Sequence, residues 1–163
     1  MEGLQGLRVH QGSPIESIKT MAQPYRLGFW RRLVNLIVRS LLRFGLSPPR
    51  TYLLTVPGRR TGKPYSTPVT LVEENGERWL VAPYGEVGWV KNARAAGKVT
   101  LGRGSRSETV RIIELAPSEA APLLKKYVTQ VPVVRPFFDV TPQSDIKDFM
   151  TEAPRHPVFR ILR

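Results

Sequence analysis

The feature that most restricts the fold of this chain is a hairpin signal between residues 66–73 (STPVTLVE) and 77–83 (ERWLVAP). Both segments are rich in apolar and β-branched residues, and the three residues Glu74-Asn75-Gly76 separate them. An Asn-Gly pair tolerates the positive φ angles of a tight hairpin turn. Two antiparallel strands are therefore predicted here.

The rest of the chain after residue 50 repeats this pattern of short apolar segments between turn residues. Strands are predicted at 51–56, 98–102, 107–115 and 157–162, and helices at 87–96, at 117–130 and through 142–151. Short strands that are mostly joined by hairpins, with helices at the margins, indicate a small closed or split barrel. The predicted fold class is α+β, mainly β: a split β-barrel of about six mostly antiparallel strands with peripheral helices.

Residues 27–44 (LGFWRRLVNLIVRSLLRF) have apolar residues at the spacing of one helical face and arginines on the other side. Two interpretations remain open for this amphipathic helix. It docks on the barrel with solvated arginines, or it lies on an anionic membrane. Residues 1–24 are rich in glycine and proline and are predicted to be a flexible arm, with 25–163 as a single domain.

The chain carries a net charge of +12, and no acidic residue occurs between Glu16 and Glu73. This excess predicts an anionic partner: nucleic acid, an acidic membrane surface or a polyanionic ligand. Cysteine is absent and the two histidines are far apart, so no metal site is expected. The sequence shows no secretory signal and no apolar run of membrane-spanning length, so a cytoplasmic location is expected.

Three of the cations lie on one short turn, Gly58-Arg59-Arg60-Thr61-Gly62-Lys63-Pro64. Arginine forks bind phosphate or carboxylate oxygens with two hydrogen bonds, and a lysine adds a point charge. A second segment, 82–92, leaves a strand, passes two glycines and enters a helix, whose first N–H groups favour anions. The alternative for this segment is an ordinary connecting loop with Trp89 in the core.

The sequence lacks the familiar sets of catalytic residues. Two unplaced histidines give no Ser-His-Asp set, and neither a phosphate-binding G-x-x-x-x-G-K-[ST] loop nor a dinucleotide-binding G-x-G-x-x-G turn is present. If the protein is an enzyme, a bound cofactor is expected to supply the reactive group.

Four segments in this order resemble a known family: Leu53–Gly62, Pro64–Leu71, Trp79–Ala82 and Gly85–Asn92. They are similar to the deazaflavin-dependent nitroreductases of actinobacteria, whose coenzyme is F-420, an 8-hydroxy-5-deazaflavin. The resemblance implies a split barrel related to flavin-reductase and pyridoxamine-phosphate-oxidase barrels. It also implies hydride transfer from the reduced coenzyme to quinones, nitroaromatics or activated alkenes, and membrane association for many members.

The resemblance assigns roles to particular residues. The turn cations would pair with the phosphodiester and glutamate tail of the coenzyme. Tyr84 and Tyr65 are candidate proton donors beside water, and Phe137, Phe138 and Trp30 are candidates for the acceptor pocket. The predicted coenzyme-binding residues are Arg59, Arg60, Thr61, Lys63, Ser66, Thr67, Pro68, Val69, Ala82, Pro83, Tyr84, Gly85, Val87, Gly88, Trp89, Val90 and Asn92.

Two positions depart from the family pattern. Pro83 stands where the family's nitroreductase has a serine, and Phe137-Phe138 stand where tyrosines are expected. Both changes disfavour nitroimidazole reduction and favour a hydrophobic small-molecule acceptor such as a quinone or an enone.

Two other functions stay open from the sequence. One is a split-barrel reductase that binds FMN instead, since both ligands carry phosphate. The other is a basic nucleic-acid-binding barrel, disfavoured because the aromatic residues occupy apolar faces rather than exposed stacking positions. No nucleic acid is therefore expected as a partner. A monomer or a homodimer is expected, in the cytoplasm, with the inner face of the plasma membrane as a peripheral site.

Overall fold

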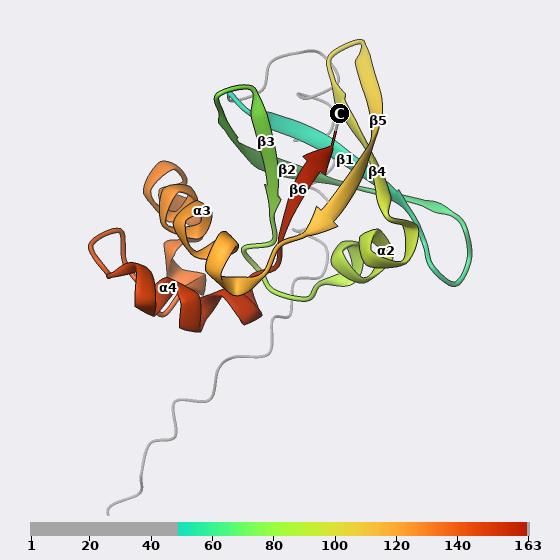
Figure 1. Cartoon of the computed structure of the whole chain (residues 1–163). Helices are drawn as coiled ribbons and strands as arrows, with labels where there is room; N and C mark the ends of the chain where they lie inside the picture. The colour runs from blue at the N-terminus through green and yellow to red at the C-terminus, as the bar shows by residue number, and fades with distance from the viewer. Residues whose placement is uncertain (1–48, 163) are drawn as a thin grey trace, which may run out of the picture.

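The computed structural model describes residues 49–162 as a closed six-stranded barrel with helices at one side and at one end (Figure 1). This confirms the predicted fold class. The predicted arm at 1–24, the amphipathic helix at 27–44 and Trp30 lie outside the described residues. Among residues 49–162, no helix has both the length and the apolar character needed to cross a membrane.

All six strands lie close to their predicted positions. Around the barrel they follow the order β1-β2-β3-β6-β5-β4, with β4 returning to β1, and every neighbouring pair is antiparallel. Four of the six pairs join strands that follow one another in the chain. The other two are β1 with β4 and β3 with β6, so that β6 lies between β3 and β5. The strands are β1 (Thr51–Pro57), β2 (Pro64–Glu74), β3 (Glu77–Val81), β4 (Lys98–Arg103), β5 (Arg106–Glu114) and β6 (Val158–Leu162).

The predicted hairpin joins β2 to β3 at Asn75 and Gly76. Their φ angles are 50° and 78°, so both residues adopt the positive values that this turn requires. The register pairs Leu71 with Leu80. Because neighbouring residues of a strand point to opposite faces, this register sends the two leucines into the barrel and leaves the residues beside them on its outer face.

The barrel interior holds one hydrophobic core. Helix α2 (Gly88–Ala96) contributes Val90 and Ala93 to this core and contacts β1 and β4. It therefore covers one end of the barrel. Ala82, which follows β3, also lies in this core, and the strand residues in it are Leu54, Val56, Val69, Leu71, Leu80, Val99, Leu101, Val110, Ile112, Phe159 and Ile161.

A second core lies outside the barrel, between the strands and a helical layer. Val72, Trp79, Val81 and Val158 provide the strand side of this core. Figure 1 shows α3 and α4 together beside β3 and β6. As a result, β3 is covered on both faces. The helical layer consists of α3 (Pro117–Gln130), η1 (Pro132–Phe137), α4 (Ile146–Glu152) and η2 (Ala153–Arg155).

The prediction of a helix through 142–151 was wrong at its start, because α4 begins at Ile146. Ser144 Oγ accepts a hydrogen bond from the Thr141 N–H at 3.0 Å, which favours a turn over 141–144. The Asp145 N–H donates to Asp148 Oδ2 at 3.1 Å, a capping contact that begins the helix at the next residue. The short helices η1 and η2 were not predicted.

Candidate functional site

The turn between β1 and β2 presents the three predicted cations on the surface. Arg59, Arg60 and Lys63 are all exposed. The Gly58 N–H donates to the Lys63 carbonyl at 2.8 Å, and the Gly62 N–H donates to the Gly58 carbonyl at the same distance, so the backbone of the turn is fixed. Among residues 49–162, no carboxylate forms an ion pair with Arg60 or Lys63. Their charges are therefore available to an anion.

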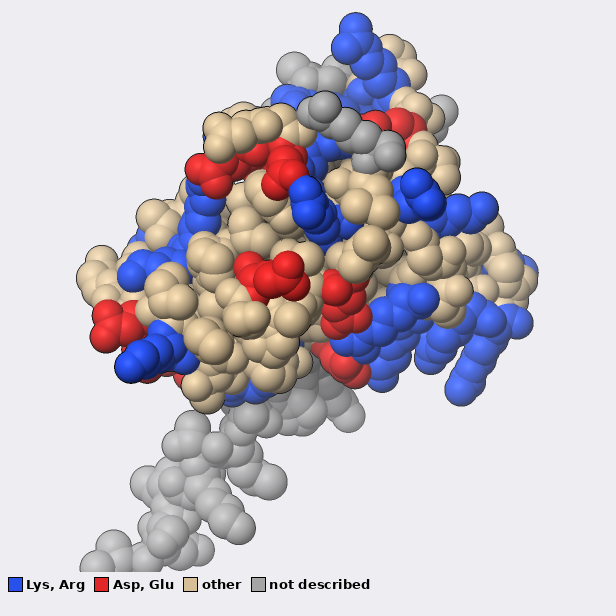
Figure 2. Space-filling view, in the orientation of Figure 1, with Lys and Arg blue, Asp and Glu red and all other residues tan. Residues whose placement is uncertain are grey.

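Asn92 connects this turn to α2. Its side chain is 7% exposed, and its Oδ1 accepts hydrogen bonds from Arg59 Nη1 at 3.1 Å and from the Arg59 N–H at 3.2 Å. The structure thus brings together the two segments that the sequence had identified separately. Figure 2 shows Lys and Arg side chains gathered over α2 and the β1–β2 turn.

The loop between β3 and α2 is tightly turned. The Gly85 N–H donates to the Ala82 carbonyl at 3.1 Å, and the Val87 N–H donates to the Gly85 carbonyl at 2.8 Å. Gly85 has a φ angle of 76°, and a Cβ atom at this position would lie 3.1 Å from the Arg155 carbonyl oxygen. Glycine is therefore the residue that fits both the angle and the space.

Arg94 on α2 fastens the same loop to the barrel. Its Nη1 donates to Glu86 Oε1 at 2.5 Å, and its Nε and Nη2 donate to the two oxygens of Glu114, both at 2.7 Å. Hydrogen bonds to Glu114 and Glu86 raise the pKa of Arg94, and the bond to Arg94 lowers the pKa of Glu86. These contacts hold the loop between α2 and β5.

Several predicted coenzyme-binding residues contribute side chains to the core. Val69, Ala82 and Val90 belong to the interior core of the barrel. Trp89 packs against this core with its ring centroid 6.1 Å from that of Phe159. These residues can therefore face a ligand mainly through their backbone.

The remaining predicted contacts lie on β2 and around the two turns. Ser66 Oγ lies 2.8 Å from Thr55 Oγ1 on β1, while Thr67 and Pro68 follow on the same strand and are partly buried. Thr61 Oγ1 accepts a hydrogen bond from the Lys63 N–H at 3.3 Å. Three more positions surround the start of α2: Pro83 is buried after β3, Val87 is the N-cap and Gly88 is the first helical residue.

Two candidates for the chemistry lie in contact. The rings of Tyr84 and Phe137 meet edge to face with centroids 4.7 Å apart, and they are 49% and 44% exposed. Phe138 turns inward instead and stacks on the His156 ring with centroids 3.9 Å apart. Tyr65 is also exposed, and it pairs with Val56 beside the basic turn.

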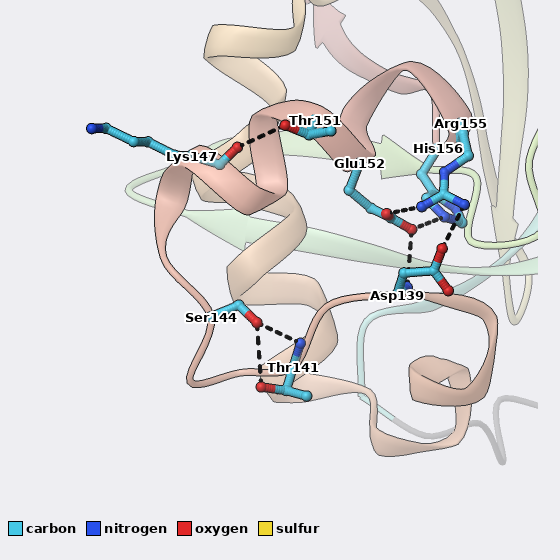
Figure 3. A network of polar contacts seen from close by, with 8 residues as sticks. All are labelled: Asp139, Thr141, Ser144, Lys147, Thr151, Glu152, Arg155 and His156. Carbon is cyan, nitrogen blue, oxygen red and sulfur yellow. Dashed lines mark hydrogen bonds and ion pairs between the residues drawn. The ribbon is translucent and has the colours of Figure 1, made fainter.

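Sequence reasoning gave no role to a polar network around Glu152 (Figure 3). Glu152 Oε1 lies 2.9 Å from His156 Nε2 and accepts from the Asp139 N–H at 3.2 Å, while Arg155 contacts both Glu152 and Asp139. Hydrogen bonds to the two carboxylates raise the pKa of Arg155. The one signal in the sequence was the i,i+4 spacing of Glu152 and His156. Within 49–162, no group of three or more His, Asp or Glu residues is arranged to hold a metal ion.

The comparison with known families gives one match. The profile of the family described as F420H(2)-dependent quinone reductase matches residues 30–137, which is more than half of the chain. This region includes the basic turn, the glycine loop and Phe137. No curated protein matches the sequence.

Many solved structures resemble the chain, among them the following three. One described as an F420-H2 dependent reductase has 26% identity and a TM-score of 0.49, covering 70% of this chain and 95% of that chain. One described as a domain-swapped dimer has 22% identity and a TM-score of 0.51, covering 82% and 97%. A protein of unknown function from Agrobacterium tumefaciens has 16% identity and a TM-score of 0.52, covering 86% and 57%. The last two support the barrel fold alone.

The exposed residues of the basic turn fit the coenzyme that this family uses. Coenzyme F420 carries a phosphodiester and a glutamate tail, and Arg60 and Lys63 offer charges that no carboxylate of residues 49–162 neutralises. Arg59 is held beside them by Asn92. The protein is an F420-dependent reductase with F420 as its cofactor. The chain belongs to the F420H(2)-dependent quinone reductase family.

Proposed function

We propose that this enzyme reduces a quinone, or another small apolar acceptor with an activated double bond, with the coenzyme tail bound along the basic turn. The link between Arg59 and Asn92 carries the proposal, because it joins the cations of the turn to the start of α2. Hydrogen bonds between charged partners contribute roughly 1.5–3 kcal/mol each. The turn therefore has the chemistry to hold a chain of negative charges.

When bound, reduced F420 supplies the hydride. The protein's contribution is binding and orientation. Arg60 and Lys63 would hold the anionic tail, and backbone groups of β2 and Ala82 would line the ring. The exposed rings of Tyr84 and Phe137 form a wall against which the acceptor rests. Holding two reactants in the geometry of reaction accounts for a large share of the acceleration in such enzymes.

The apolar character of this wall supports a quinone or an enone as the acceptor. Pro83 is buried after β3 and offers no hydroxyl group. Phe137 offers an aromatic edge without a polar atom. A planar, apolar acceptor gains burial against these rings, whereas a nitroimidazole would find fewer hydrogen-bond donors.

Tyr84 and Tyr65 remain the side-chain candidates for proton donation, and the contact with Phe137 favours Tyr84. If Tyr84 donates the proton, Tyr84→Phe lowers kcat and leaves the coenzyme Kd unchanged. Tyr65→Phe tests the other candidate in the same way, because it removes the same hydroxyl from another exposed tyrosine. An unchanged kcat in both variants would indicate that water donates the proton.

Quenching of the fluorescence of oxidised F420 on adding protein tests the proposed coenzyme site. Micromolar or tighter binding is expected at about 0.05 M salt, with clear weakening at about 0.5 M, because the Debye length shortens several-fold. FMN serves as the competitor in the same titration. Failure of F420 to bind, or displacement of F420 by stoichiometric FMN, would contradict the proposal.

We further propose that residues 27–44 place the enzyme at the inner face of the plasma membrane, where an apolar acceptor dissolves. The support is the alternation of apolar residues and arginines in that segment. Co-sedimentation with anionic vesicles at low salt, compared with neutral vesicles, tests this. If the same amount of protein stayed in the supernatant with anionic and with neutral vesicles, this proposal would be contradicted.

For the assembly we propose a homodimer in which residues 25–163 form one domain and residues 1–24 a flexible arm. The support is a structural relative whose description is a domain-swapped dimer. Light scattering coupled to size-exclusion chromatography measures the mass, and limited proteolysis locates the arm. A monomeric mass would contradict the homodimer, and resistance of residues 1–24 to cleavage would contradict the flexible arm.

A further inference from the structure

A buried carboxylate binds residues of the segments that neighbour the proposed acceptor wall. The Glu152 side chain is 3% exposed and receives hydrogen bonds from three directions. The Asp139 N–H lies 3.2 Å from Oε1, His156 Nε2 lies 2.9 Å from the same oxygen, and Arg155 Nη2 contacts Oε2. A carboxylate accepts several such bonds, and each donor is thereby fixed in direction.

Each of the three donors holds part of the segment that carries the wall. The Asp139 N–H belongs to the residue after Phe138, so its bond to Glu152 fixes the backbone there. His156, held through Nε2, presents its ring face to Phe138 at a centroid distance of 3.9 Å. Arg155 Nη1 donates to Asp139 Oδ2 at 2.7 Å (Figure 3). The segment behind Phe137 is therefore fixed at three points.

The same network also contacts the loop that carries Tyr84. A Cβ atom at Gly85 would lie 3.1 Å from the Arg155 carbonyl oxygen, so the loop rests on the backbone of η2. Tyr84 in turn contacts Phe137 with centroids 4.7 Å apart. The segments that carry both rings therefore contact residues that Glu152 binds.

His156 is held through one ring nitrogen, because Nε2 lies 2.9 Å from Glu152 Oε1. Nδ1 is buried and has no hydrogen-bond partner among the described residues. The ring is therefore fixed chiefly by Glu152 and by its stacking on Phe138.

Stability alone does not account for such a network. A buried ionic group is costly to desolvate, and apolar residues of the same volume are often as stabilising or more so. Unlike an apolar residue, a carboxylate with three hydrogen-bond donors fixes the position of each donor. We propose that Glu152 is a positioning residue for the acceptor pocket, which fixes Phe137 and Tyr84 through Asp139, Arg155 and His156. This inference rests on the proposed function of that wall.

The test compares Glu152→Gln with a matched control, Glu119→Gln. The amide that replaces the carboxylate of Glu152 cannot accept at both terminal atoms, so at least one of the three donors loses its partner. Glu119 also lies in the helical layer, where its Oε2 accepts from the Ala116 N–H at 3.3 Å, but it lies on the first turn of α3 and is exposed. Should Glu152→Gln fail to fold, Glu152→Asp keeps the charge for Arg155 and shortens the reach by one methylene.

Menadione serves as the quinone and oxidised F420 as the coenzyme probe. For the Glu152 variant we expect KM for menadione to rise about five- to tenfold, with the coenzyme Kd within roughly twofold of wild type; kcat falls as well if Tyr84 donates the proton. The Glu119 variant is expected to keep all three constants. A loss of kcat or of active protein at unchanged KM would overturn the proposal, because a purely structural role predicts that result.

Fluorine NMR of protein labelled with 3-fluorotyrosine gives a readout that needs no turnover. The chain has five tyrosines, and the Tyr84 signal is identified by its loss in Tyr84→Phe. Glu152→Gln is expected to shift the Tyr84 signal and leave that of Tyr65 in place. An unmoved Tyr84 signal would overturn the positioning role. Wild-type protein that fails to bind F420 or to reduce menadione would instead contradict the proposed function.

Discussion

Asn92 holds Arg59 by two hydrogen bonds to one oxygen atom, from the backbone N–H at 3.2 Å and from Nη1 at 3.1 Å. The two residues are 33 positions apart, and the contact sets the orientation of the basic turn against α2. The remaining N–H groups of the Arg59 guanidinium are left to face an anion. The first prediction follows from this geometry.

Asn92→Ala is expected to raise the coenzyme Kd about tenfold, equivalent to about 1.4 kcal/mol. The reason is that Arg59 must then be ordered by the ligand itself. Gln130→Ala is the matched control, because Gln130 Oε1 accepts from Arg50 Nη1 at 3.1 Å, an amide–arginine contact on an exposed surface. Fluorescence titration measures both. Equal Kd values would show that Asn92 does not act through Arg59.

Arg60→Ala is expected to weaken coenzyme binding without lowering the free energy of unfolding by more than about 0.5 kcal/mol. Arg60 is exposed and forms no ion pair within 49–162, so folding gains little from it. The loss of affinity should be larger at low salt than at high salt. Arg106→Ala, which removes an exposed arginine from the β4–β5 hairpin, should change neither quantity. Equal losses in the two variants would mean that net charge alone sets the affinity.

The bidentate contact of Arg78 with Glu108 predicts a pH dependence of stability. The hydrogen bond from Arg78 lowers the pKa of Glu108 below its ordinary value of 4.5. A lowered pKa in the folded state adds stability above the unfolded pKa, and this stability disappears as the pH falls through the folded value. Because the pair is exposed to water, the gain is about 0.2–1 kcal/mol at neutral pH.

Urea unfolding of wild type and Glu108→Gln checks this pH dependence. The wild type should be the more stable at pH 7, and the two curves should converge in the acid range below pH 4.5. Salt at about 1 M should also reduce the difference. A difference that persists at the acid end would assign the effect to packing rather than to charge.

Leu124→Ala tests whether the outer core can be weakened independently of the site. Leu124 is 0% exposed in the core between α3 and the barrel. Its truncation should lower the free energy of unfolding by about 2–5 kcal/mol. The coenzyme Kd of the folded protein should stay the same, since α2 packs on the other core and Arg59 of the basic turn is bound to Asn92 of α2. A weaker Kd measured well below the unfolding midpoint would contradict this separation.

Local patterns predicted most of the fold. The positive φ angles at Asn75 and Gly76 follow directly from those two residues, and the apolar period of β1 to β5 predicted their positions. The pairing of β1 with β4, and the place of β6 between β3 and β5, depend on contacts between distant segments. No local signal encodes them, so the sequence indicated a barrel without its strand order.

The candidate site divides in the same way. The basic turn and the glycine loop were recognised because a few neighbouring cations or glycines are enough to indicate an anion-binding turn. The bond between Arg59 and Asn92 was not predicted, although both residues had been named. The Glu152–His156 pair was missed because, without the fold, a histidine at i,i+4 from a glutamate is also typical of an ordinary helix surface.

The place of β6 has a consequence for the order in which the chain is synthesised. The five residues Val158–Leu162 fill the gap between β3 and β5, after every other described element has been made. Until they pair, a nascent chain exposes two open sheet edges, and the apolar faces of both cores stay incomplete. Chains halted before Val158 should therefore aggregate or depend on chaperones, even though they already contain the entire basic turn and glycine loop.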